Sequence, residues 1–137
     1  MRLKLFLTMM LITAVVIVLS ACGSSSDSNA AYTQLSQDET ISMMEENSDY
    51  VILDVRTQEE YDEGHIPDAI CIPNETIGGK QPEELRDLDQ MIFVYCRSGR
   101  RSKEASQKLV DMGYTRVYEF GGIDTWAGKG ERVCGRY

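Results

Sequence analysis

The chain has 137 residues, the length of one domain, and its charged and apolar fractions are those of an ordinary globular protein. Its formal net charge of −8 argues against a nucleic acid as partner, because a phosphate backbone would be repelled. Any basic cluster on this acidic chain is therefore expected to be a local anion site.

The first 21 residues have the pattern of a secretory signal and are not expected to join the fold. Arg2 and Lys4 give a positive start, and Leu5 to Leu19 is apolar apart from two threonines. The next residues, Ser20-Ala21-Cys22, complete an ending that resembles the lipobox of bacterial lipoproteins. In that family the signal is cleaved before the cysteine, whose sulfur then carries a diacylglycerol. The alternative is an uncleaved anchor, although the apolar run is short for a span of about 20 residues.

The lipobox resemblance implies a protein held at the extracytoplasmic face of the cell membrane through lipid on Cys22. Two acyl chains are enough for stable attachment. Residues 22–31 are small and polar, so they predict a flexible tether between lipid and domain. The folded domain is then expected to occupy residues 32–137.

The domain is expected to begin with a short strand at residues 32–35, followed by a helix. Ser36 and Glu39 match a capping box, which predicts a helix with Ile41 and Met44 on its apolar side. A buried strand is predicted at residues 50–55, because this run is almost entirely apolar.

The later elements alternate between strands and helices. Strands are predicted at 69–72, 91–95 and 117–120, and helices at 58–62 and 83–88. Thr57 caps the helix at 58–62 and Gly64 ends it; a longer helix has Ser102 as N-cap and stops at Gly113. A short helix from Ile123 to Ala127 follows the last strand, and its Trp126 is expected to pack in the core. This alternation predicts an α/β fold, with a parallel sheet of about five strands covered by helices on both faces.

The segment between the strand at 91–95 and the following helix carries the chemistry. It reads Cys96-Arg97-Ser98-Gly99-Arg100-Arg101, a thiol followed by three guanidinium groups. A tight turn into a helix directs backbone N–H groups and the positive end of the helix dipole at one point. The pKa of a cysteine at that point should fall below its usual value of about 8.5. The segment therefore predicts a nucleophilic sulfur that attacks an anionic substrate.

Cys-Arg-Ser-Gly-Arg-Arg-Ser after an apolar strand resembles the active-site loop of the rhodanese (sulfurtransferase) homology domain. Three other stretches match that family in its order: Asp54-Val55-Arg56, the GHIPDA run at 64–69 and the GGIDTW run at 121–126. The resemblance extends from about Tyr32 to the C-terminus and implies a single rhodanese-like domain.

The resemblance also implies the reaction and its residues. Cys96 would take a sulfane sulfur from an anionic donor such as thiosulfate, hold it as a persulfide and pass it to a thiol or to cyanide. The residues that would bind the substrate are Arg97, Ser98, Gly99, Arg100, Arg101 and Ser102. This expected reaction needs no cofactor or metal. The protein is expected to be a monomer. In the family pattern His65 supports a loop and takes no part in the chemistry.

Asp54 and Arg56 are expected to support the site. The family motif places Asp54 at the carboxyl edge of the sheet, where its carboxylate can accept hydrogen bonds from loop N–H groups. Arg56 is expected to pair with a carboxylate such as Glu59 or Glu60, and the alternative is that its charge helps hold the domain or the anionic substrate near the loop.

Two other enzyme classes remain as alternatives. A phosphatase or arsenate reductase of similar fold would need an arginine at the position of Ser102, but the basic residue here, Arg101, comes one position earlier. A thiol redox protein could pair Cys96 with Cys134 or Cys71, whereas a Cys71–Cys134 disulfide would leave Cys96 free. A noncatalytic rhodanese-like binding module is disfavoured because Cys96 is present.

Overall fold

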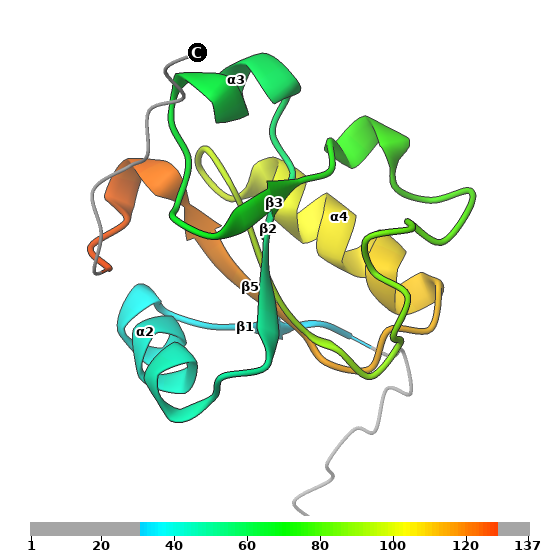
Figure 1. The fold of residues 1–137 in the computed structure, drawn as a ribbon, viewed down its shortest axis with the longest axis horizontal. Coiled ribbons are helices and arrows are strands. Elements are labelled where there is room, and N and C mark those ends of the chain that lie inside the picture. The colour runs from blue at the N-terminus through cyan, green and yellow to red at the C-terminus, as the bar shows by residue number, and fades with distance from the viewer. Residues whose placement is uncertain (1–30, 129–137) are drawn as a thin grey trace, which may run out of the picture.

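The computed structural model describes residues 31–128, and they form one α/β domain. Its sheet contains five parallel strands in the order β1-β5-β4-β2-β3 (Figure 1). The strands are β1 (Thr33–Gln34), β2 (Tyr50–Asp54), β3 (Ala69–Cys71), β4 (Met91–Cys96) and β5 (Val117–Gly122). The predicted fold class is therefore confirmed. The predicted signal, the tether apart from its last residue, Ala31, and the last nine residues of the chain lie outside the described residues.

Helices cover both faces of this sheet, and Figure 1 shows α2 (Gln37–Glu46) and α4 (Arg100–Asp111) on opposite sides. A shorter helix, α3 (Gln58–Glu63), and two 3-10 turns, η1 (Asn74–Thr76) and η2 (Ile123–Thr125), lie in the connections.

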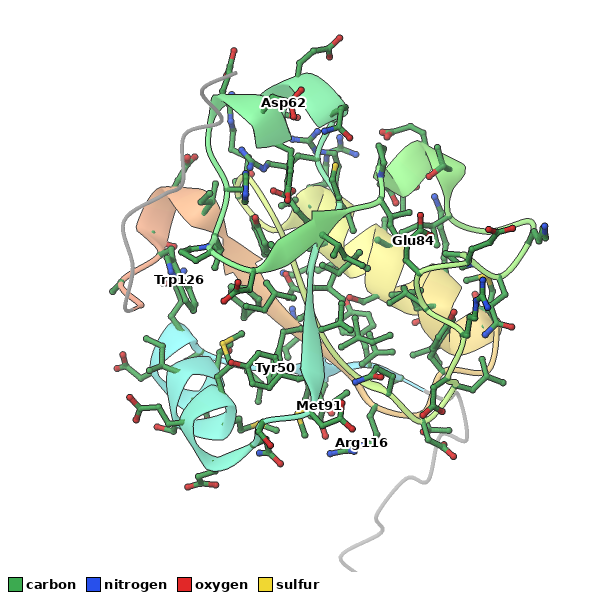
Figure 2. The ribbon with its side chains drawn as sticks, viewed as in Figure 1. Tyr50, Asp62, Glu84, Met91, Arg116 and Trp126 are labelled. Carbon is green, nitrogen blue, oxygen red and sulfur yellow. The ribbon has the colours of Figure 1, made fainter. Side chains whose placement is uncertain are left out.

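The residues of β4 alternate between two cores, as the two-residue period of a strand requires. Ile92, Val94 and Cys96 belong to the core that includes Ala105 and Leu109 of α4. Met91, Phe93 and Tyr95 belong to the other core, into which α2 packs its methionines. Figure 2 shows Tyr50 and Trp126 on this second side, where Trp126 packs at the edge of the core against Phe120 with ring centroids 5.2 Å apart. The alternation directs the Cys96 side chain toward α4.

Two capping boxes start the helices that precede and follow β2. Glu39 N donates to Ser36 Oγ at 3.3 Å, and Ser36 N donates to Glu39 Oε2 at 2.7 Å. Thr57 caps α3 in the same way, and Gly64 ends that helix with an N–H bond to Tyr61 O at 3.1 Å. The predicted caps of both helices are confirmed.

One predicted element is absent, and two others differ in their bounds. Residues 83–88 form turns instead of a helix, anchored by the buried Leu85 and by Gln81 Nε2, which donates to Leu85 O at 2.9 Å. The helix before Gly113 is present, but Ser102 is not its N-cap, because α4 begins two residues earlier, at Arg100, after Gly99. The short helix predicted from Ile123 is present as the 3-10 turn η2, but it ends at Thr125, and Trp126 already has extended backbone.

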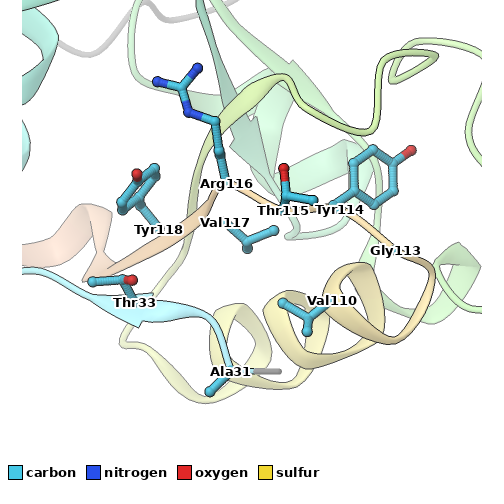
Figure 3. A pocket seen from close by; sticks show the side chains of 9 residues that line it. All are labelled: Ala31, Thr33, Val110, Gly113, Tyr114, Thr115, Arg116, Val117 and Tyr118. Atoms are coloured by element: carbon cyan, nitrogen blue, oxygen red, sulfur yellow. The ribbon is translucent and has the colours of Figure 1, made fainter. Parts of the chain in front are cut away.

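A hollow of about 350 Å³ lies at the amino end of β5, between that strand, the start of β1 and the end of α4 (Figure 3). Its lining includes Ala31, Thr33, Val110 and residues 113–118. Because the strands are parallel, Cys96 lies at the other end of the sheet. Between residues 31 and 128, none of the helices has the length and apolar character needed to cross a membrane.

Candidate active site

Cys96 is the last residue of β4, and its side chain is almost completely buried, with 1% of its surface exposed. The segment from Cys96 to Ser102, called here the Cys96 loop, curls over the carboxyl end of β4 into the first turn of α4. Gly99 makes the curl possible, because its φ of 107° lies in a region that residues with a Cβ rarely adopt. Its N–H donates to Cys96 Sγ at 3.1 Å. The loop therefore holds the sulfur at the amino end of a 12-residue helix.

Two opposing effects set the ionisation of this thiol. Burial raises the pKa of Cys96, but hydrogen bonds from the Ser102 hydroxyl, when its proton faces the sulfur, and from the N–H groups of Ser102, Gly99 and Ser98 lower it further than burial raises it. The net pKa lies below the usual value for cysteine, in the direction that the sequence predicts. The arrangement therefore favours a thiolate that is surrounded by N–H groups.

The three arginines of the Cys96 loop have different environments. Arg101 Nη1 and Nη2 donate to Glu60 Oε2 and Oε1 at 2.6 and 2.9 Å, and the Arg101 side chain is 17% exposed. Arg97 is 60% exposed, with Nε 3.7 Å from the same carboxylate. Arg100 is 80% exposed, and Nη1 lies 3.9 Å from Glu104. Only Arg97 and Arg100 thus present most of their side chains to solvent.

Glu60, from α3, binds the Cys96 loop through Arg101. The hydrogen bonds from Arg101 are the main reason that its pKa falls to about 2. Glu60 remains ionised at every physiological pH and neutralises part of the positive charge around the sulfur. The sequence offered Glu60 as a partner of Arg56 and gave no sign of this contact with Arg101.

Arg56 pairs with a carboxylate, as expected, but the carboxylate is that of Asp54 and not that of Glu59 or Glu60. Its Nη2 donates to Asp54 Oδ2 at 2.7 Å and to Gly64 O at 2.7 Å. Asp54 also accepts the Arg56 backbone N–H at 3.0 Å and the Tyr95 hydroxyl at 2.6 Å. Both charged groups are buried. These bonds therefore connect the carboxyl ends of β2 and β4, where Tyr95 directly precedes Cys96.

His65 follows α3, and Cys71 is the last residue of β3. His65 stacks on Tyr61 at a centroid distance of 3.7 Å, and its Nδ1 lies 2.9 Å from Tyr61 O. Cys71 is half-buried on β3, and burial is the main cause that raises its pKa to about 11. β2 separates β3 from β4. Two strand spacings are about 9.6 Å, too far for a Cys71–Cys96 disulfide in the folded domain.

The structure brings two further residues to the site that the sequence analysis did not single out. A Cβ on Gly122 would lie 1.9 Å from Arg97 O, so only glycine permits this close approach of β5 to the Cys96 loop. Glu119 of β5 is 2% exposed and accepts the Ser102 hydroxyl at 2.6 Å. A charged residue in the otherwise apolar run 117–120 was the available signal for Glu119.

No group of His, Cys, Asp and Glu side chains in the described part of the chain could hold a metal ion. The predicted lipidation residue, Cys22, and the third candidate thiol, Cys134, lie outside that part. Among the residues that the structure places, the chemically distinctive group is a buried sulfur that accepts backbone N–H bonds, with two exposed arginines beside it.

The chain is similar to known sulfur-transferring proteins over most of its described length. The family model for the rhodanese-like domain matches residues 36–129. A sulfurtransferase of Allochromatium vinosum is 40% identical over 86 residues, which cover 62% of this chain and 78% of that protein. A thiosulfate sulfurtransferase of Coxiella burnetii is 34% identical over 96 residues, 69% of this chain and 87% of that protein.

A solved structure, described as a rhodanese with anions from E. coli, has the same fold. It aligns with a TM-score of 0.55 at 33% identity, and the alignment covers 61% of this chain and 96% of that one. The parallel sheet, the Cys96 loop and the sequence matches agree with one another. The chain belongs to the rhodanese-like domain family, whose relatives named above support sulfurtransferase activity in general.

Proposed function

We propose that the protein is a rhodanese-type sulfurtransferase that carries a sulfane sulfur on Cys96. The observation that supports this most is the Gly99 N–H bond to Cys96 Sγ at 3.1 Å, in a loop that begins a helix. Such an arrangement of N–H groups stabilises negative charge on sulfur without a metal or a general base.

The reaction would proceed in two displacement steps. The Cys96 thiolate attacks the outer sulfur of thiosulfate, the S–S bond of the donor breaks, and sulfite leaves with the electron pair. Cys96 then carries a persulfide, whose negative terminal sulfur is stabilised by the N–H groups of the loop. In the second step a thiol or cyanide attacks that terminal sulfur, and Cys96 leaves as a thiolate.

The geometry disfavours the two other enzyme classes. A phosphatase or arsenate reductase would need a free arginine at the position of Ser102 to bind a tetrahedral oxyanion, but the adjacent Arg101 is already bound by both oxygens of Glu60. A redox pair with Cys71 would require a disulfide across β2. Cys134 lies outside the described residues, and a disulfide between Cys96 and Cys134 is tested by the intact mass of the protein before it is reduced.

The direct test is an intact-mass measurement on the full-length protein, reduced and then incubated with thiosulfate. The proposal expects a gain of one sulfur atom, which is lost when cyanide is added with release of thiocyanate. Peptide mapping should place the added sulfur on Cys96. A chain that gains no sulfur, or gains it only on another cysteine, would contradict the proposal.

Arg97 and Arg100 are expected to attract the donor anion. Replacing either by alanine should raise KM for thiosulfate about twofold to fivefold, because an exposed charge contributes roughly 0.2–1 kcal/mol. Added salt should raise KM in the native protein for the same reason. Glu60→Gln should have the opposite effect, since it leaves the charge of Arg101 less neutralised. If KM stays constant in all three variants, the backbone alone binds the anion.

We also propose that Cys22 carries lipid and that the domain works at the extracytoplasmic face of the membrane, acting as a monomer on small donors and acceptors. The support is the sequence pattern of residues 1–22 alone. In bacterial cells, mass spectrometry of the mature N-terminus should find a chain that begins at Cys22 with a diacylglyceryl thioether. Cys22→Ala should leave the precursor uncleaved. Native protein that starts at Met1, or that starts beyond Cys22 without lipid, would contradict this proposal.

A further inference from the structure

The Ser102 hydroxyl is surrounded by more acceptors than it can serve. Its oxygen lies 2.6 Å from Glu119 Oε1, 3.0 Å from Gly99 O, 3.3 Å from Gly121 O and 3.5 Å from Cys96 Sγ. A hydroxyl has one proton to donate and two lone pairs with which to accept. A distance of 2.6 Å is typical of a hydroxyl that donates to a carboxylate. The proton of Ser102 therefore points at Glu119, and its lone pairs remain for other donors.

This direction of the hydroxyl has a consequence for the sulfur. The Cys96 S–H group can donate to Ser102 Oγ, and that bond stabilises the neutral thiol. A thiolate at the same place would need the Ser102 proton for itself. The hydroxyl can stabilise the thiolate only by turning away from Glu119, so the carboxylate and the sulfur compete for one proton.

Glu119 is fixed in the position that creates this competition. Its Oε1 also accepts the Gly121 N–H at 2.9 Å, and its Oε2 accepts Gln34 Nε2 at 3.1 Å from β1. The side chain is 2% exposed, so water does not screen its charge well. A Cβ added to Gly99 would lie 3.9 Å from Glu119 Oε1, which shows that the carboxylate lies directly behind the loop that holds the sulfur.

We propose that Glu119 is a positioning residue that controls the charge on the Cys96 sulfur through the hydroxyl of Ser102, an inference that rests on the proposed role of Cys96. Glu119 favours the neutral thiol over the free thiolate, both by holding the Ser102 proton and by its own negative charge. In the persulfide the negative charge lies on the outer sulfur and not on Sγ, the atom 3.5 Å from Ser102 Oγ. The competition for the Ser102 proton therefore concerns the free thiolate.

Other charged or titratable groups face this pair from each neighbouring element. They are Arg101 of α4, Glu60 of α3, which neutralises Arg101 in part, the exposed Arg97 and Arg100 of the loop, and Tyr32 before β1, whose pKa is raised by burial and then by Glu119. Arg101 acts on Cys96 in the opposite sense to Glu119, because its positive charge favours the thiolate. None of the others accepts a hydrogen bond from Ser102.

The test measures the titration of Cys96 with no sulfur donor present. The full-length protein and its Glu119→Gln variant are treated with iodoacetamide between pH 5 and pH 10, and the rate of alkylation of the Cys96 peptide is followed by mass spectrometry. Glu119→Gln should lower the midpoint by about one pH unit and make alkylation below the midpoint about tenfold faster, as expected for loss of a nearby buried like charge. Glu46→Gln, which removes an exposed charge at the end of α2, should not move the midpoint.

A second variant, Ser102→Ala, distinguishes the effect of the hydroxyl from that of the carboxylate. It also provides the test if Glu119→Gln does not fold. In Ser102→Ala the midpoint should stay or fall, because the lost lone pair stabilised the thiol. A midpoint that rises would overturn the inference, since the hydroxyl proton would then have been on the sulfur. An unchanged midpoint in folded Glu119→Gln would overturn it as well.

The two proposals can fail separately. Native protein that gains no sulfur from thiosulfate, while Glu119→Gln still shifts the alkylation midpoint, contradicts the sulfurtransferase function and leaves the role of Glu119. Native protein that gains sulfur on Cys96, while the midpoint of folded Glu119→Gln equals the native one, contradicts the role of Glu119 alone.

Discussion

Cys96→Ser is expected to abolish sulfur loading from thiosulfate, with a fall of at least about a thousandfold in transfer rate. A serine hydroxyl stays protonated even beside the N–H groups that stabilise a thiolate, so the nucleophile is lost. The fold should survive, because the Gly99 N–H that donates to Sγ at 3.1 Å can donate to a hydroxyl oxygen instead. Intact mass after thiosulfate and production of thiocyanate in the presence of cyanide measure the loss.

Cys71→Ser is the matched control for this experiment. Cys71 is half-buried on β3, and its pKa, raised to about 11, keeps it a neutral thiol at pH 7. Its replacement should leave sulfur loading and thiocyanate production close to those of the native protein. Transfer that persists undiminished in Cys96→Ser, or that disappears in Cys71→Ser, would show that Cys96 is not the carrier.

The sheet and its position relative to Cys96 could be predicted because they follow from local patterns. The apolar runs of β2 and β4 are long enough to be buried on both faces, and capping boxes at Ser36 and Thr57 identify where α2 and α3 start. A parallel sheet then places Cys96 at its carboxyl edge. Each step needs only residues that are close in the sequence.

The wrong predictions concern structure that depends on distant residues. The segment at 83–88 has helix-forming residues, but Leu85 O is taken by the Tyr114 hydroxyl, and Leu88 O accepts Thr115 N at 2.9 Å. These bonds hold the segment against the chain that precedes β5, so partners outside 83–88 decide its conformation. No pattern within 83–88 reveals those partners.

The start of α4 could not be predicted correctly because the Ser102 hydroxyl has two possible hydrogen-bond partners. A serine before an apolar helical pattern usually caps its own helix, but Ser102 donates to Glu119 on β5. Gly99 takes the N-cap position, with no side-chain bond to the helix. The partner of Arg56 was also set by a distant residue. Arg101 binds Glu60, and Arg56 binds Asp54. The spacing of these residues in the sequence does not show this.

Asp54→Ala is expected to destabilise the domain by about 3–5 kcal/mol, because it leaves the Arg56 guanidinium buried without its counter-charge. The Tyr95 hydroxyl would also lose the acceptor that lies 2.6 Å away. A loss of this size is comparable to the whole stability of many small domains, about 5–15 kcal/mol. Urea unfolding followed by circular dichroism measures it, and Asp54→Asn provides a milder variant that keeps the shape of the side chain.

Two comparisons distinguish an unpaired charge from general damage to the fold. Asp38→Ala removes an exposed carboxylate from the first turn of α2 and should lower the free energy of unfolding by no more than about 1 kcal/mol. The double variant Asp54→Ala/Arg56→Ala removes both charges, so it should be more stable than Asp54→Ala alone. If the double variant is instead less stable than Asp54→Ala, the ion pair is not what holds β2 beside β4. In that case lost packing at the carboxyl edge of the sheet accounts for the destabilisation, and Arg56 supports the Cys96 loop through its bond to Gly64 O.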